Sequence, residues 1–289
     1  MAELENYFFD HNSWSFTRHR AWNRCRRQYY FDYIAPYLRT PAPVDVNRIR
    51  LLRNYQSRFV LQGQIIHDIL DEQIGLHCDR KPMDPAGATN SYFRKVARNK
   101  EMADELFTEY RHGDPVDAQF FTAMEKSGKA CLDMFFGTIW PKYRDREPLR
   151  HEEYDRFSIG DVDVLVKVDF ASRMQNGTIV LTDWKTGTDN DEYETELQMA
   201  AYVLWAVQYY NRSPDEIRSE LVFLKNGETK PYPFFEEQLC EIQETITTDF
   251  DAMNASYEFG DFPPRPVLRE CLSCRFAEVC PEAGFRRGK

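Results

Sequence analysis

Two carboxylates and a lysine in the second half of the chain form the pattern best suited to chemistry. Thr178–Lys185 is predicted to be a strand, so Asp183 and Lys185, two residues apart, project to the same side. Asp161–Phe170 is predicted as the strand before it, and a hairpin turn would bring Asp169 beside the pair. Two carboxylates suit a hard cation such as Mg²⁺, which activates water and polarises a phosphodiester, while a lysine stabilises charge developing on phosphate. A surface ion pair on a hairpin is the alternative.

A helix predicted over Glu194–Tyr210 follows the two strands and adds polar side chains. Gln198 and Tyr202 are four residues apart, so they share one face of this helix. They would be able to hold a phosphate or a nucleotide near the metal. An ordinary helix with a half-buried tyrosine is the alternative.

Cysteines make a second pattern, in the proline-rich tail. Cys271, Cys274 and Cys280 lie within ten residues of one another, and core packing explains such density poorly. Metal sites and iron–sulfur clusters of this kind take four thiolates. A fourth would have to come from elsewhere in the chain, from Cys25, Cys78, Cys131 or Cys240. The total of seven is odd and argues against a disulfide framework.

The elements expected to position these residues change character near residue 150. The earlier part has helical periodicity, and the later part alternates helices with short strands. We therefore predict an α/β fold with three regions: a helical N-terminal half over 1–149, a mixed central sheet flanked by helices over 150–262, and a cysteine-rich tail over 263–289. The expected helices are 15–34, 48–76, 91–111, 116–140, 194–210 and 236–257, and further strands are expected over 221–224 and 230–235.

Charge is distributed unevenly along the chain. The net charge of −10 argues against a large nonspecific nucleic-acid surface, but residues 1–60 carry ten Lys or Arg against five Asp or Glu. This pattern allows a basic groove on an acidic body, and a set of solvated helix faces is the alternative. No apolar run approaches the roughly 20 residues of a membrane helix. The first residues lack the layout of a signal peptide, so the expected location is cytoplasmic.

The order of these motifs resembles the RecB-like branch of the PD-(D/E)XK nucleases. Asp183–Gly187 reads Asp-Trp-Lys-Thr-Gly and is similar to that family's Asp-Tyr-Lys-Thr-Gly. Gln62–His67 resembles its Gly-x-x-x-His helix, which implies that His67 joins the metal site. The family also carries a glutamate on the strand before the first aspartate. Glu152 and Glu153 compete for that position, and Glu153 is favoured. Lys167 departs from the family pattern, which often has glycine there.

The segment around Cys25 resembles the start of RecB-like nucleases that carry an iron–sulfur cluster, in which one early cysteine joins three late ones. The resemblance implies a [4Fe–4S] cluster held by Cys25, Cys271, Cys274 and Cys280, with Arg26 where the family usually has proline. A Cys₄ zinc site is the rival, although zinc sites more often use two Cys-x-x-Cys pairs.

The resemblance implies a metal-dependent DNA nuclease, similar to CRISPR adaptation exonucleases and to the nuclease part of AddB-type proteins. His67, Asp169, Asp183 and the backbone carbonyl of Trp184 would hold Mg²⁺ or Mn²⁺. Lys185 would position the attacking water, and Gln198 and Tyr202 would steady the strand. The implied substrate is single-stranded DNA or DNA ends, in DNA repair or CRISPR adaptation.

Other expectations concern partners and rival functions. The sequence has no complete Gly-x-x-x-x-Gly-Lys-[Ser/Thr] motif, so any helicase or integrase-type partner would be a separate protein. The aromatic residues of the N-terminal arm would either stack on bases or pack the arm against the core; these are Trp14, Trp22, Tyr29 and Tyr30. A catalytically silent DNA-binding scaffold and a zinc-stabilised interaction protein are the rival functions.

Overall fold

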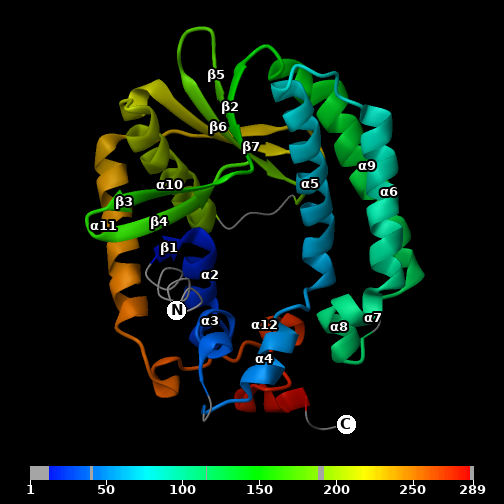
Figure 1. Cartoon of the computed structure of the whole chain (residues 1–289), viewed down its shortest axis with the longest axis vertical. Helices are drawn as coiled ribbons and strands as arrows, with labels where there is room; N and C mark the ends of the chain where they lie inside the picture. The colour runs from blue at the N-terminus through cyan, green and yellow to red at the C-terminus, as the bar shows by residue number, and fades with distance from the viewer. Residues whose placement is uncertain (1–12, 40–41, 115, 188–191, 287–289) are drawn as a thin grey trace.

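A mixed five-stranded sheet is the centre of the molecule in the computed structural model, which describes residues 13–39, 42–114, 116–187 and 192–286. The strand order is β2-β5-β6-β7-β8; β6 and β7 are parallel and the other neighbours are antiparallel. The sheet lies in the upper part of the molecule in Figure 1. The strands are β2 (Glu147–His151), β5 (Phe170–Arg173), β6 (Ile179–Lys185), β7 (Ile217–Phe223) and β8 (Thr229–Tyr232).

A second, three-stranded sheet has the order β1-β4-β3. It consists of β1 (Ser13–Ser15), β4 (Val162–Lys167) and β3 (Tyr154–Ile159). Val162, Val164 and Val166 of β4 are buried while the residues between them are partly exposed, which is the alternation of a half-buried strand.

The predicted strand Asp161–Phe170 is in fact divided between the two sheets. β4 ends at Lys167, β5 begins at Phe170, and Val168 and Asp169 lie between them. The backbone N–H of Glu152 donates to the carbonyls of Val168 (3.0 Å) and Asp169 (3.3 Å), in place of a continuing strand ladder. Asp169 therefore stands where the chain passes from the small sheet to the large one.

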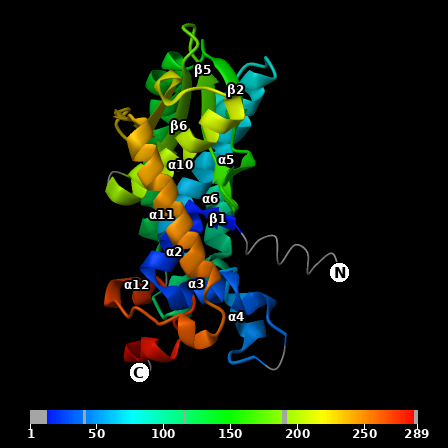
Figure 2. The same cartoon turned by 90° about the vertical axis from the view of Figure 1, so that its left-hand side faces the viewer.

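Helices cover both faces of the large sheet. The first half supplies one layer, in which residues of α5, α6 and α9 form a buried cluster with Phe170, Trp184, Val222 and Leu224 of the sheet region. On the other side, α10 and α11 pack with residues of both sheets, and α11 runs from the sheet toward the opposite end of the molecule (Figures 1 and 2). These helices are α5 (Arg58–Cys78), α6 (Pro85–Glu101), α9 (Ala118–Met134), α10 (Glu192–Tyr210) and α11 (Glu236–Asn254).

The expected helix over 91–111 is three helices: α6, α7 (Ala103–Leu106) and α8 (Thr108–Arg111). The last break falls at Phe107, which is extended and fully buried. The backbone at Phe107 also forms an isolated β-bridge with Gln56. The helical run is therefore interrupted where the Phe107 side chain is buried and its backbone pairs with another segment.

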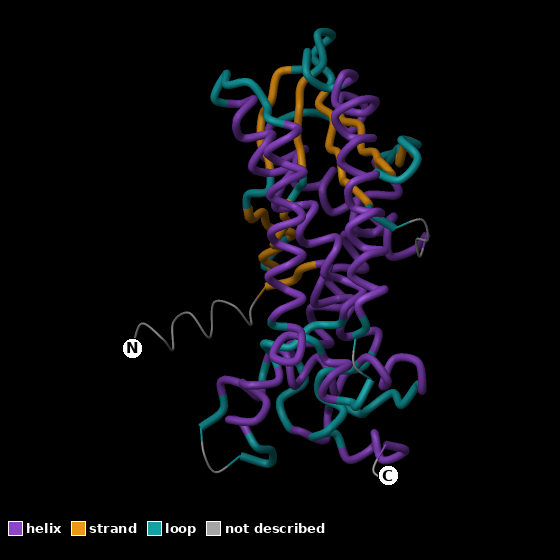
Figure 3. Tube along the Cα trace, turned by 90° about the vertical axis from the view of Figure 1, so that its right-hand side faces the viewer, coloured by secondary structure: helices purple, strands orange, loops and turns teal. Residues whose placement is uncertain are grey.

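The opposite end of the molecule is built from short helices joined by loops (Figure 3). It contains α2 (Phe16–Arg24), α3 (Arg26–Tyr33), α4 (Val46–Leu52) and α12 (Leu268–Ser273). One aromatic-rich core joins these parts, drawn from the N-terminal arm, the segment after α11 and the tail: it includes Trp22, Tyr30, Phe31, Phe262 and Phe276.

The single helix expected over 15–34 is interrupted at Cys25. This residue is extended (φ −163°, ψ 109°) and separates α2 from α3. Its sulfur accepts a 3.5 Å hydrogen bond from the backbone N–H of Arg265, which lies ahead of α12. The break therefore places the Cys25 thiol beside the tail rather than on a regular helix surface. Within the described residues, no helix is both long and apolar enough to cross a membrane.

Candidate functional site

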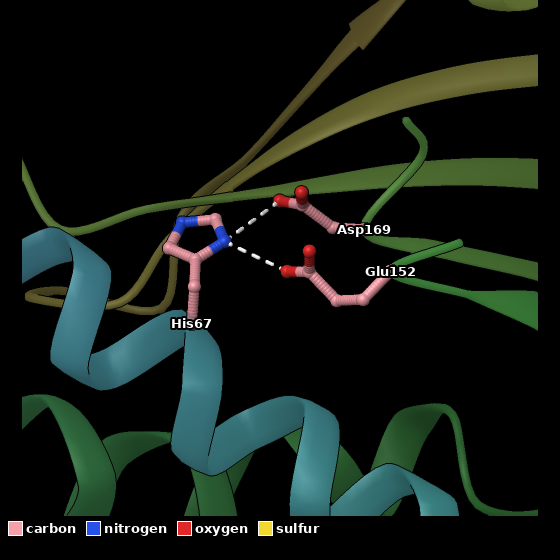
Figure 4. Close-up of side chains that lie close together, drawn as sticks. All are labelled: His67, Glu152 and Asp169. Atoms are coloured by element: carbon pink, nitrogen blue, oxygen red, sulfur yellow. Dashed lines mark hydrogen bonds and ion pairs between the residues drawn. The ribbon is translucent and has the colours of Figure 1, made fainter. Parts of the chain in front are cut away.

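Three potential metal ligands meet where α5 faces the junction of the two sheets. The Nδ1 atom of His67 lies 3.1 Å from Glu152 Oε1 and 3.4 Å from Asp169 Oδ2. Figure 4 shows His67 reaching from α5 toward the two carboxylates. Within the described parts of the chain, His67, Glu152 and Asp169 form a group of possible metal ligands, and their ligand atoms all lie within 4.8 Å of one another. One nitrogen and two carboxylate oxygens are a donor set that Mg²⁺ or Mn²⁺ accepts.

Asp183 and Lys185 lie on β6 and project to the same side, as the strand pattern predicts. Lys185 Nζ is 2.7 Å from Asp183 Oδ2. Trp184 points to the opposite side, where its ring packs against Phe135 and Tyr143. Alternation along one buried strand thus separates the polar pair from the hydrophobic core.

Asp169 is tied to β6 by a backbone hydrogen bond. The N–H of Trp184 donates to Asp169 Oδ2 over 2.8 Å, and both Asp169 and Asp183 are buried. The two carboxylates are thereby held next to each other by the β5–β6 hairpin. The sequence predicts this proximity from the hairpin.

Gln198 and Tyr202 of α10 form a chain of hydrogen bonds that includes Asp183 and Lys185. The Gln198 amide donates to Asp183 Oδ1 (3.1 Å) and to the Tyr202 hydroxyl (2.8 Å). Lys185 Nζ donates to Gln198 Oε1 (3.3 Å), and the Tyr202 hydroxyl donates to the Lys167 carbonyl (2.8 Å). The two helix residues therefore fix the orientation of Asp183 and Lys185.

The glutamate that the structure places beside His67 is Glu152 and not Glu153, the one that the sequence favoured. The Glu152 side chain is 9% exposed and contacts both His67 and Lys167. The Glu153 side chain is 59% exposed and pairs with Arg150 at 2.9 Å. Glu152 has a positive φ of 46°, and strand alternation gives no signal for such a backbone conformation.

Burial and neighbouring charges shift the titration of these groups. Burial, followed by the Asp169 charge, raises the pKa of Asp183 to about 6 despite the Lys185 ammonium. Burial by itself would lower the pKa of His67, but the Asp169 and Glu152 carboxylates raise it well above its usual value. Repulsion between buried carboxylates is the electrostatic situation that a divalent cation relieves.

The site opens into a wide cleft, with a volume of about 1060 Å³. Its walls come from α2, α5, α10 and the small sheet. Cationic side chains line it beside the acids; they are Arg18, Arg20, Lys167 and Lys185.

The four cysteines singled out from the sequence line one small cavity at the opposite end of the molecule. Burial, then the charges of nearby Cys25 and Cys280 among other acidic groups, raises the pKa of Cys274 to about 12. Burial also raises the pKa of Cys280 to about 11. The other three cysteines do not line this cavity: Cys78, Cys131 and Cys240.

The aromatic residues considered for base stacking are all buried. Trp14 packs in the core of the two sheets, and Trp22, Tyr29 and Tyr30 pack around Phe262. Their exposed fractions are 3% or less, so packing of the arm, and not stacking on bases, is their role in this structure.

The chain matches the model of a known family. The model of the PD-(D/E)XK nuclease superfamily matches residues 13–281. A solved structure titled "Crystal structure of SSO0001" has 14% sequence identity, with 65% of this chain and 80% of that chain covered and a TM-score of 0.30. A comparison with curated proteins gives no match.

Proposed function

The chain belongs to the PD-(D/E)XK nuclease superfamily, and from this we propose that it is a Mg²⁺- or Mn²⁺-dependent deoxyribonuclease of the RecB-like branch. The observation that carries the proposal is the convergence of His67, Glu152, Asp169, Asp183 and Lys185 on one cleft. These residues come from three parts of the chain and bring carboxylates, an imidazole and an ammonium group together.

We propose that His67, Glu152, Asp169, Asp183 and the Trp184 carbonyl hold the cation. Asp169 and Asp183 are buried, and Glu152 is nearly so, hence a divalent charge would offset the repulsion among them. A bound Mg²⁺ or Mn²⁺ supplies Lewis acidity and a water of lowered pKa. His67 contacts Asp169 and Lys185 contacts Asp183, so basic side chains also face the two aspartates.

Lys185 would orient the attacking water and stabilise charge on the phosphate. Its ammonium is held between Asp183 (2.7 Å) and Gln198 (3.3 Å), so its position is fixed before substrate binds. Tyr202 and Gln198 would keep this geometry through their mutual 2.8 Å hydrogen bond. Preorganised donors of this kind contribute most where charge develops during reaction.

The proposed substrate is single-stranded DNA or a DNA end, degraded exonucleolytically. Arg20 of α2 lines the cleft on the side of the N-terminal arm, and its exposed guanidinium would attract the phosphate backbone. The motifs Gln62–His67 and Asp183–Gly187 support the RecB-like branch.

A cleavage assay on end-labelled single- and double-stranded DNA tests this function. Metal-dependent cleavage by the wild type, lost in Lys185→Ala, would support it, and the product ladder would show polarity and whether cleavage starts at ends. A wild type that binds DNA but cleaves no end structure would favour the silent DNA-binding scaffold instead.

We also propose that Cys25, Cys271, Cys274 and Cys280 hold a [4Fe–4S] cluster. All four line one cavity although Cys25 is far from the others in sequence. The raised pKa values of Cys274 and Cys280 mean that thiolates there need a compensating positive charge, which a metal centre supplies.

The division into one early and three late cysteines favours a cluster over a single zinc ion, because zinc sites more often use two Cys-x-x-Cys pairs. Iron and sulfide analysis, with absorbance near about 400 nm after anaerobic purification, distinguishes the two. Stoichiometric zinc without iron would contradict the cluster.

A further inference from the structure

Tyr154 and Lys167 face each other at one wall of the cleft and have no part in the function proposed above. Tyr154 begins β3, Lys167 ends β4, and the two are direct partners in the antiparallel register. Side chains directly opposite in such a pair project from the same face of the sheet. Both residues line the cleft that also contains Asp183.

Tyr154 is unusually exposed for an aromatic residue. It is 78% exposed, the largest value among the big hydrophobic residues in the described chain. Its ring lies 5.5 Å from Lys167 Nζ, so a cation stands over the ring. An exposed ring with a neighbouring ammonium, on the wall of a cleft, offers stacking area and phosphate binding together.

Lys167 connects this pair with the reaction centre. Its ammonium forms an ion pair with Glu152, whose other oxygen is 3.1 Å from His67. Lys167 precedes Asp169 by two residues and Tyr154 follows Glu152 by two, so the pair lies beside the acidic group in the sequence as well as in the cleft.

We propose that Tyr154 and Lys167 form a nucleotide-binding subsite for single-stranded DNA next to the reaction centre. The Tyr154 ring stacks on one base, and the Lys167 ammonium contacts the phosphate of the same nucleotide. If Glu152 held the proposed cation, the Lys167 ammonium would exchange its ion pair with Glu152 for this phosphate contact. Stacking needs a base free of its neighbours, so the subsite selects single strands over duplex. The inference rests on the proposed nuclease function and specifies its substrate.

Binding of a fluorescent single-stranded oligonucleotide, measured with Ca²⁺ in place of Mg²⁺, tests the stacking contact. Tyr154→Ala is expected to weaken binding by about 5- to 100-fold, while Tyr154→Phe and Tyr154→Trp stay within about 2-fold because both keep a ring. Tyr257 is the matched control: it is 75% exposed but does not line the cleft, so Tyr257→Ala is expected to bind like the wild type.

The salt dependence of binding tests the phosphate contact separately. Lys167→Gln is expected to reduce the slope of log affinity against log salt by about 0.7, the loss of one contact to a single strand. Tyr154→Phe is expected to leave this slope unchanged. An unchanged slope in Lys167→Gln would overturn the role of the lysine.

Each remaining outcome separates the subsite from the function on which it rests. If Tyr154→Ala behaved like Tyr257→Ala while the wild type still bound and cleaved DNA, the subsite would be wrong and the nuclease function would stand. An equal loss on duplex would overturn the selection of single strands. A wild type that neither bound nor cleaved any DNA would overturn both.

Discussion

The cleft and the cysteine cavity both gather residues that are distant in sequence, but the fold holds them differently. In the cleft, Asp183 is part of a buried strand, and Asp169 accepts a hydrogen bond from the Trp184 N–H. The cysteines stand at a break between helices and in short helices and turns of the tail. The sheet itself therefore holds the residues of the cleft in place, whereas the positions of the cysteines depend on the contacts that join the N-terminal arm to the tail.

This difference predicts two kinds of mutational effect. Changes in the cleft should remove activity and leave the fold intact, because its frame is made by β5, β6 and α10. Substitutions in the cavity should lower the stability of the fold, because a ligand that binds only to the folded chain contributes directly to the free energy of folding. The following substitutions, in order of decreasing expected effect, test the contrast.

Asp183→Asn should abolish cleavage, by about 10³-fold or more in kcat, because it removes one proposed ligand and the partner of Lys185. The fold should persist, since burial already raises the pKa of Asp183 to about 6 and a neutral side chain of the same shape is tolerated there. Cleavage kinetics and thermal unfolding measure the two effects. A large fall in Tm would contradict the view that the sheet organises this site.

Cys274→Ala should lower Tm by about 10 °C or more, because it removes a proposed ligand from the cavity that joins the arm to the tail. Iron content should fall with it. Cys240→Ala is the matched control, since Cys240 is exposed on α11 and outside the cavity. Equal Tm and iron content in the two variants would refute the ligand assignment.

Glu152→Gln should weaken metal-dependent activity by about 10- to 100-fold, with partial recovery at higher metal concentration. The reason is that Glu152 contacts His67 and is nearly buried, so its charge acts on the proposed cation site. Titration of cleavage rate against Mn²⁺ gives the apparent metal affinity. Wild-type affinity in this variant would exclude Glu152 as a ligand.

Glu153→Gln should change activity by less than about 2-fold, the smallest effect in the series. Its side chain is exposed and pairs with Arg150, and exposed ion pairs contribute little. The same Mn²⁺ titration makes the two adjacent glutamates a matched pair. A larger loss in Glu153→Gln than in Glu152→Gln would reverse the assignment made from the structure.

Much of the cleft follows from local rules of sequence. Strand alternation places Asp183 and Lys185 on one side, and helical spacing places Gln198 and Tyr202 on one face. The hairpin then brings Asp169 close. The α/β class follows in the same way from the change of periodicity near residue 150.

Other features depend on interactions between distant segments. The expected helix 15–34 breaks at Cys25, whose sulfur accepts a hydrogen bond from the Arg265 N–H. The expected strand 161–170 divides at Val168 and Asp169, whose carbonyls accept from the Glu152 N–H. The aromatic residues of the arm are buried because Phe262 and Phe276 arrive from far along the chain. Periodicity contains no information about such partners.

The sequence by itself determined the chemical groups of this protein and their local directions: two acids and a lysine on adjoining strands, a glutamine and a tyrosine on one helix face, and a cluster of three late cysteines. The tertiary structure decided which of two adjacent glutamates faces His67 and placed Cys25 in the same cavity as the tail cysteines. It also set Tyr154 opposite Lys167 at the cleft. The physical reason is that side-chain periodicity is set by the local backbone, whereas a positive φ, a helix break or a strand partner is stabilised by contacts from distant parts of the chain.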